Sequence, residues 1–176
     1  MNNSTKHSFN DTENLVARAH RRATGEELGV IRINLLIKHC SCLIADTLSD
    51  LLKPYGLCYK SYLIMVMMYS RDDAINPSEL CDNMGETRSN MTRLCDELVG
   101  RDLAKRVTNA ADRRRIDLSL TDHGLAIIQE VLPLLRERIK QMYARLGDTM
   151  RIQLEEGLQG LLLAVEDSRR TWNNEG

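Results

Sequence analysis

Two short stretches of the 176-residue chain carry side chains that suit contacts with double-stranded nucleic acid. The first combines hydroxyl, guanidinium and amide groups within about two helical turns: Thr87, Arg88, Ser89, Asn90 and Arg93. Guanidinium groups pair with guanine edges, an amide pairs with adenine, and hydroxyls bind bases or phosphates. An ordinary polar helix face would contain the same residue types, so this stretch alone does not decide the function.

The second stretch is the charged run Asp112, Arg113, Arg114 and Arg115. It lies between two segments of alternating hydropathy, 103–107 and 116–120, and this pattern predicts a hairpin with a basic tip. Side chains alternate across a strand, so the three arginines cannot all reach one groove. One can enter a narrow minor groove, and a second can hold a phosphate. Asp112 would repel DNA, so we expect it to hold an arginine by an ion pair.

The composition excludes binding by overall charge, because the formal net charge is -1. From 87 to 119 there are eight basic and five acidic residues, a local excess of three positive charges. This excess favours a local DNA-binding patch, although a solvated charge run remains an alternative. The 43% hydrophobic share with only 4% aromatic residues is typical of a mainly helical core.

No membrane or export signal is expected. The first residues are polar, without the apolar region of a signal peptide. The apolar run from residue 30 is broken by Arg32, Asn34, Lys38 and His39, so we do not interpret it as a membrane span. Five cysteines without a C-x-x-C pair predict reduced thiols in the cytoplasm, mostly as small core residues.

The order of elements predicts a mainly α fold with a small β-hairpin wing. Helical patterns cover 29–52, 59–69, 79–84 and 87–101, the hairpin follows, and helices resume at 121–146 and from 148. This is the order of a winged helix-turn-helix with a helical dimerisation domain. We assign 1–29 to an N-terminal arm, 30–55 and 121–170 to dimerisation, and 56–120 to DNA binding.

The segment 77–124 resembles the DNA-binding region of the MarR family of bacterial regulators. The resemblance is carried by Asp112 to Arg115 and by the following Leu118-Ser119-Leu120-Thr121 and Gly124. It implies a homodimer, a palindromic operator, and repression relieved by a small, often aromatic and anionic, effector. It also implies that Arg114 enters the minor groove and that Asp112 orients it. The chain looks closest to the branch that regulates multidrug-efflux or aromatic-compound genes.

A ligand site is expected beside the first long helix. Arg32 and His39 lie on one side of that helix, and the next helix offers aromatic and soft apolar walls at Tyr59, Tyr62, Met65 and Tyr69. A cation beside a tyrosine hydroxyl suits a carboxylate or phenolate. The same stripe would also serve as ordinary core. Arg18 and His20 in the arm form a second candidate.

Three alternatives remain open. A redox-sensing regulator of the same fold would use Cys40 or Cys42 beside Lys38 and His39. A helical interaction module would not bind DNA at all. A metal sensor is disfavoured because the histidines lack ligand spacing with cysteine. The phosphate-loop, G-x-S-x-G and H-E-x-x-H motifs do not occur, so we expect no enzyme, no cofactor and no metal.

Overall fold

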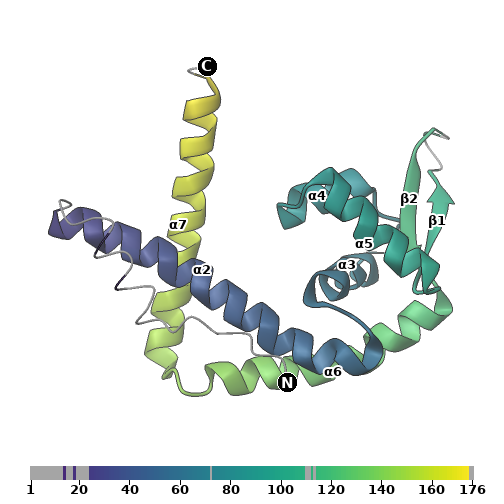
Figure 1. The fold of residues 1–176 in the computed structure, drawn as a ribbon, viewed down its shortest axis with the longest axis horizontal. Coiled ribbons are helices and arrows are strands. Elements are labelled where there is room, and N and C mark those ends of the chain that lie inside the picture. The colour runs from purple at the N-terminus through teal and green to yellow at the C-terminus, as the bar shows by residue number, and fades with distance from the viewer. Residues whose placement is uncertain are drawn as a thin grey trace. The chain divides into compact units, whose positions relative to one another are not determined.

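A computed structural model describes Asn14, Arg18 and residues 24–71, 73–109, 112 and 114–174, with side chains through 171. It confirms the predicted class, because the described residues form helices and one two-stranded antiparallel sheet (Figure 1). The chain divides into two compact units, Met1–Gln129 and Glu130–Gly176. The first unit contains the helix-turn-helix and the hairpin.

The first long helix, α2 (Gly25–Leu52), begins before the expected residue 29. Thr24 and Glu27 form a capping box: the Thr24 hydroxyl accepts the Glu27 N–H at 3.3 Å, and the Glu27 carboxylate accepts the Thr24 N–H at 2.6 Å. The T-x-x-E pattern therefore starts the helix within the assigned arm. The 3-10 turn η1 (Lys53–Tyr55) follows, and Gly56 ends it at φ 63°.

Helix α2 is unusually apolar for its exposure. The segment Gly25–Tyr55 contains an 18-residue window of mean hydropathy 1.5, none of it buried, so length and composition alone would let it cross a membrane. Val30 and Ile33 are among its exposed apolar side chains. Helices of soluble proteins pass the same test, so one such helix is weak evidence for a span.

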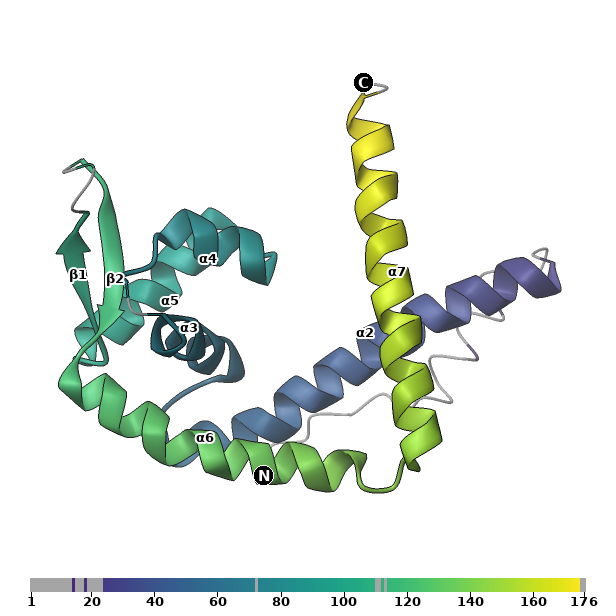
Figure 2. The ribbon, with the colours of Figure 1, turned by 180° about the vertical axis from the view of Figure 1, so that it is seen from behind.

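Three helices form the helix-turn-helix and its support. Helices α3 (Tyr59–Tyr69), α4 (Pro77–Met84) and α5 (Arg88–Gly100) lie within two residues of their predicted bounds. The Cys58 sulfur caps α3, Asn76 caps α4 and Thr87 caps α5. Figure 2 shows α3, α4 and α5 gathered beside the hairpin. The core that joins them contains Ile64, Met65, Leu80, Met91, Leu94, Cys95 and Leu98.

The hairpin consists of β1 (Ala104–Thr108) and β2 (Ile116–Leu120), which pair from Ala104↔Leu120 to Thr108↔Ile116. An isolated bridge joins β2 to the segment before α4. Ile75 and Leu118 exchange two backbone hydrogen bonds of 2.8 Å. The middle of β2 is therefore attached to the segment that precedes α4, while the tip of the hairpin lies beyond these bonds.

Helix α6 (Asp122–Tyr143) begins against the base of the hairpin. The Thr121 hydroxyl accepts the Gly124 N–H at 2.9 Å, which caps the helix as predicted. A Cβ on Gly124 would lie 1.9 Å from the Leu103 carbonyl oxygen. Only glycine permits this approach, which explains why the motif after the hairpin requires it.

The second unit contains the end of α6 and helix α7 (Asp148–Asn174). Its apolar side chains are largely exposed in the single chain: Leu134, Ile139, Met150, Ile152, Leu154, Leu158, Leu161, Leu162, Leu163 and Val165.

The expectation that the cysteines are mostly core residues is wrong. Cys40, Cys42 and Cys58 are exposed, Cys81 is half-buried, and only Cys95 among them is buried. A helical period locates a face, but it does not show how far the neighbouring elements extend along that face.

Candidate nucleic-acid interface

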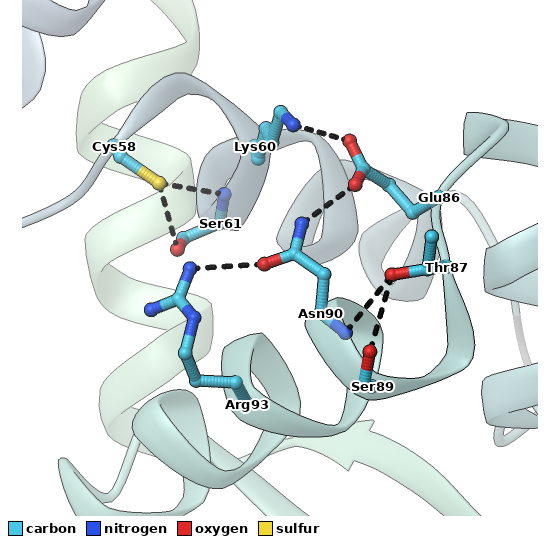
Figure 3. Close-up of polar contacts among 8 residues, drawn as sticks. All are labelled: Cys58, Lys60, Ser61, Glu86, Thr87, Ser89, Asn90 and Arg93. Atoms are coloured by element: carbon cyan, nitrogen blue, oxygen red, sulfur yellow. Dashed lines mark hydrogen bonds and ion pairs between the residues drawn. The ribbon is translucent and has the colours of Figure 1, made fainter.

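Thr87, a predicted base or phosphate contact, ends the turn before α5. Its hydroxyl accepts the Asn90 N–H at 3.3 Å and lies 3.4 Å from the Ser89 hydroxyl (Figure 3). This is the hydrogen bond of a helix N-cap. Thr87 therefore orients the first turn of α5 even in the free protein.

Asn90 and Arg93 are held by acidic residues of the protein itself. The Asn90 amide donates to Glu86 Oε2 at 2.6 Å, and its carbonyl oxygen accepts from Arg93 at 3.2 Å. Arg93 also pairs with Glu97 at 3.3 Å. Figure 3 shows that the side chains of Glu86 and Arg93 point toward that of Asn90. A base contact by either residue would require rearrangement of this network.

Glu86 connects the network to α3. Its Oε1 lies 2.5 Å from the Lys60 ammonium, and only 15% of its side chain is exposed. Hydrogen bonding by Lys60 and then by Asn90 lowers the pKa of Glu86, although burial acts in the opposite direction. The ionised carboxylate therefore ties the start of α5 to α3.

Arg88 and Ser89 lie at the exposed start of α5. Within the described part of the chain, no side chain pairs with the Arg88 guanidinium. The Thr92 hydroxyl donates to the backbone carbonyl of Arg88 at 2.8 Å, a bond that does not involve the guanidinium. Of the two arginines in α5, Arg88 is therefore the one that can contact a new partner without breaking an ion pair.

The hairpin tip differs from the expected ion pair. Asp112 accepts the backbone N–H of Arg114 at 3.0 Å, and among the described residues it pairs with no guanidinium. The Asp112 N–H donates to the Asn109 side chain at 2.9 Å, and the Arg115 N–H donates to the Asp112 carbonyl at 2.9 Å. Asp112 thus shapes the backbone and leaves Arg114 and Arg115 exposed. Arg113 lies outside the described residues.

The sequence analysis missed Asp117, which is 4% exposed at the inner end of this loop. Its carboxylate accepts from Asn76 at 3.0 Å and from Asn109. Burial raises the pKa of Asp117. The hydrogen bonds from Asn109 and Asn76 and the charge of Arg115 lower it by more, so the pKa lies below its ordinary value. An acidic residue inside an apolar strand was the available signal.

The candidate ligand residues are divided between core and surface. Tyr62 and Met65 are buried, and the ring of Tyr62 stacks on that of Tyr59 with centroids 6.0 Å apart. Tyr69, Arg32 and Arg18 are exposed, and His39 is half-buried. His20 lies outside the described residues. The core interpretation thus accounts for Tyr62 and Met65.

Comparison with known proteins identifies relatives. Residues 55–115 match a family model described as MarR family. The transcriptional repressor MprA of Escherichia coli (strain K12) is 31% identical over 137 residues, which cover 77% of this chain and 78% of that protein.

Two solved structures share the fold. CouR from Rhodococcus jostii RHA1 bound to p-coumaroyl-CoA is 23% identical, with a TM-score of 0.66 over 73% of this chain and 90% of that one. The S. aureus MepR–DNA complex is 16% identical, with a TM-score of 0.67 over 74% and 94% of the two chains.

Replacement of Glu86 tests the link between α3 and α5. The folded pKa of Glu86 lies below its unfolded value, so its stabilisation is present above that unfolded value and is lost as the pH falls through the folded pKa. We expect Glu86→Gln to lower the free energy of unfolding by about 1 kcal/mol near neutral pH, since Lys60 is half-exposed. Near pH ~3 the difference from the wild type should shrink.

Urea unfolding of the wild type and of Glu86→Gln, at one protein concentration and at each of the two pH values, measures these differences. Lys60→Met should produce a similar loss, and the double variant should lose less than the sum of the two single losses. A loss that stays the same at both pH values would contradict the ionised link.

Proposed function

This chain belongs to the MarR family of transcription regulators, and from that premise we propose that it is a homodimeric repressor which a small aromatic anion releases from a palindromic operator. The observation that carries the proposal is the exposure of two guanidinium groups in one DNA-binding unit, Arg88 at the start of α5 and Arg114 at the wing tip. Because chromosomal DNA is the target, we assign its action to the cytoplasm.

We assign separate roles to the two elements. The start of α5 enters the major groove, where Arg88 and Ser89 read base edges. Asn90 and Arg93 join them by exchanging their contacts with Glu86 and Glu97 for DNA. The wing places Arg114 in the minor groove, and Arg113 and Arg115 contact phosphate. The fold of the MepR–DNA complex supports this assignment.

The exposed apolar faces of α2 and α7 support a homodimer. Each of these helices exposes several large apolar side chains, and exposed apolar faces of this kind mark interaction surfaces. A second copy related by a two-fold axis covers the same patches on both chains and presents two recognition helices about 34 Å apart.

The effector proposal rests on α3. The stacked rings of Tyr59 and Tyr62 on α3 suit the aromatic ring of a ligand. Arg32 of the same chain does not reach the anionic group of such a ligand, because it lies about 25 Å along α2 from Ser49, whose hydroxyl accepts the Tyr59 N–H. A solved relative with p-coumaroyl-CoA bound shows that this fold accommodates a ligand. An effector releases DNA only if it prefers the free protein to the DNA-bound protein by a few kcal/mol.

The redox alternative has less support. Burial and the neighbouring Asp96 raise the pKa of the Cys95 thiol to about 11, so this cysteine is a poor nucleophile. Cys40 and Cys42 are exposed on α2 and remain the residues that a redox mechanism would use.

Removal of the wing arginine tests the DNA contact. We expect Arg114→Ala to weaken binding to the DNA upstream of the protein's own gene by roughly 10- to 100-fold, because one minor-groove contact is lost. Lys53→Ala is the control, since Lys53 lies in η1, pairs with Asp50 of α2 and has no role assigned to it in DNA binding. Fluorescence anisotropy measures both. Unchanged tight binding by Arg114→Ala would overturn the role of Arg114, and an absence of specific binding by the wild type would favour an interaction module that does not use DNA.

A charge on the apolar face of α7 tests the dimer. We expect Leu158→Arg to yield monomers in sedimentation velocity and to abolish tight operator binding, because an unpaired charge would be buried. Glu156→Arg is the control, since Glu156 lies on roughly the opposite side of the helix. A Leu158→Arg protein that remains helical and dimeric would rule out this interface.

A screen of aromatic carboxylates by thermal shift tests the effector. Hits should raise the midpoint of the free protein and release it from DNA. Tyr59→Ala should weaken these hits by about 10-fold, as expected for loss of one stacking contact, whereas Lys38→Ala, which removes an exposed cation of α2, should not. Release by peroxide but by no aromatic acid would support the redox alternative instead.

A further inference from the structure

A continuous path of hydrogen bonds connects the start of α4 to the wing tip. Asn76 caps α4 by accepting the Ser78 N–H at 2.9 Å, and its amide group donates to Asp117 at 3.0 Å. The other carboxylate oxygen of Asp117 accepts from Asn109. Asn109 then accepts the Asp112 N–H at 2.9 Å, and Asp112 accepts the Arg114 N–H at 3.0 Å.

Each asparagine in this path acts in two directions. Its carbonyl oxygen shapes the local turn, and its amide group donates to Asp117. Asp117 is the acceptor that the two turns share, and it satisfies both because an ionised carboxylate has two accepting oxygens. An asparagine at this position would present one oxygen and one NH2 group, so it could accept from only one of the two donors in the same way.

The burial of Asp117 shows that packing does not explain its presence. A buried charge carries a desolvation cost that only good hydrogen bonds offset, and a branched apolar side chain would fill the same strand position without that cost. The distinctive effect of Asp117 is the orientation of the wing loop. A two-stranded hairpin is marginally stable by itself, so its tip needs such an attachment to hold one position.

We propose that Asp117 is a positioning residue for operator binding, which sets the wing loop relative to α4 and so places Arg114 in the minor groove. The proposal rests on the role assigned above to Arg114. Arg114 is exposed and its guanidinium has no partner within the described part of the chain, so its backbone position decides where the side chain reaches. Asp117 itself is buried and does not touch DNA.

A double-mutant cycle tests the proposal on the full-length dimer. We expect Asp117→Asn to weaken operator binding by about 10-fold in the wild-type background and in an Arg88→Ala background. In an Arg114→Ala background the same change should have almost no effect, because the side chain that it positions is gone. A merely structural role would lower the affinity by the same factor in all three backgrounds.

An exchange of the two side chains provides a rescue. In the variant Asp117→Asn with Asn109→Asp, the amide at 117 donates to the carboxylate at 109, and its oxygen still accepts from Asn76. The carboxylate at 109 also still accepts the Asp112 N–H. Each single variant should bind DNA more weakly than the wild type, and the exchange variant should recover most of the affinity at unchanged net charge.

Each outcome decides the question. Equal losses in all backgrounds, or no rescue by a folded exchange variant, would overturn the role of Asp117 and leave the proposed function standing. No effect of Arg114→Ala on tight operator binding would overturn the roles of Arg114 and Asp117 alone, whereas an absence of specific DNA binding by the wild type would overturn the proposed function. Should Asp117→Asn fail to fold, Asn109→Ala breaks the same path of hydrogen bonds from the wing side and replaces it in the cycle. Circular dichroism and urea unfolding check the fold of every variant.

Discussion

The one-sided burial of α5 is the constraint on which the DNA-binding unit depends. Leu94 and Leu98 are almost fully inaccessible, so the helix cannot rotate without exposing them. The polar first turn is thereby held outward. Glu86 adds a second restraint by joining that turn to Lys60 of α3. A recognition surface that is fixed before DNA arrives loses less conformational entropy on binding.

The sequence was most informative where structure is local. Hydropathy period predicted the helix-turn-helix, and alternation predicted the hairpin. The capping box at Thr24 was equally local but was overlooked, so the start of α2 was misplaced. The exposure of Cys40 and Cys42 could not be read from periodicity, since it depends on whether another element covers that face.

The interactions that shape the wing are different in kind. Among the described residues Asp112 binds the backbone N–H of Arg114 two residues away and no guanidinium, because short polar side chains compete well for nearby backbone groups. Asn76 and Asp117 are 41 residues apart and meet through tertiary folding. The sequence therefore indicated candidate DNA contacts more readily than the residues that hold those candidates in place.

The acidic neighbours of the basic residues have a consequence for how ions accompany binding. Lys60, Arg93 and Arg106 already pair with carboxylates of the protein, whereas Arg88 and Arg114 have no such partner in the described residues. A paired cation that moves to a phosphate leaves behind a carboxylate, which then attracts cations from solution. Counterion release from DNA is thus partly offset. The affinity of this regulator should depend on ionic strength less steeply than its number of basic residues suggests.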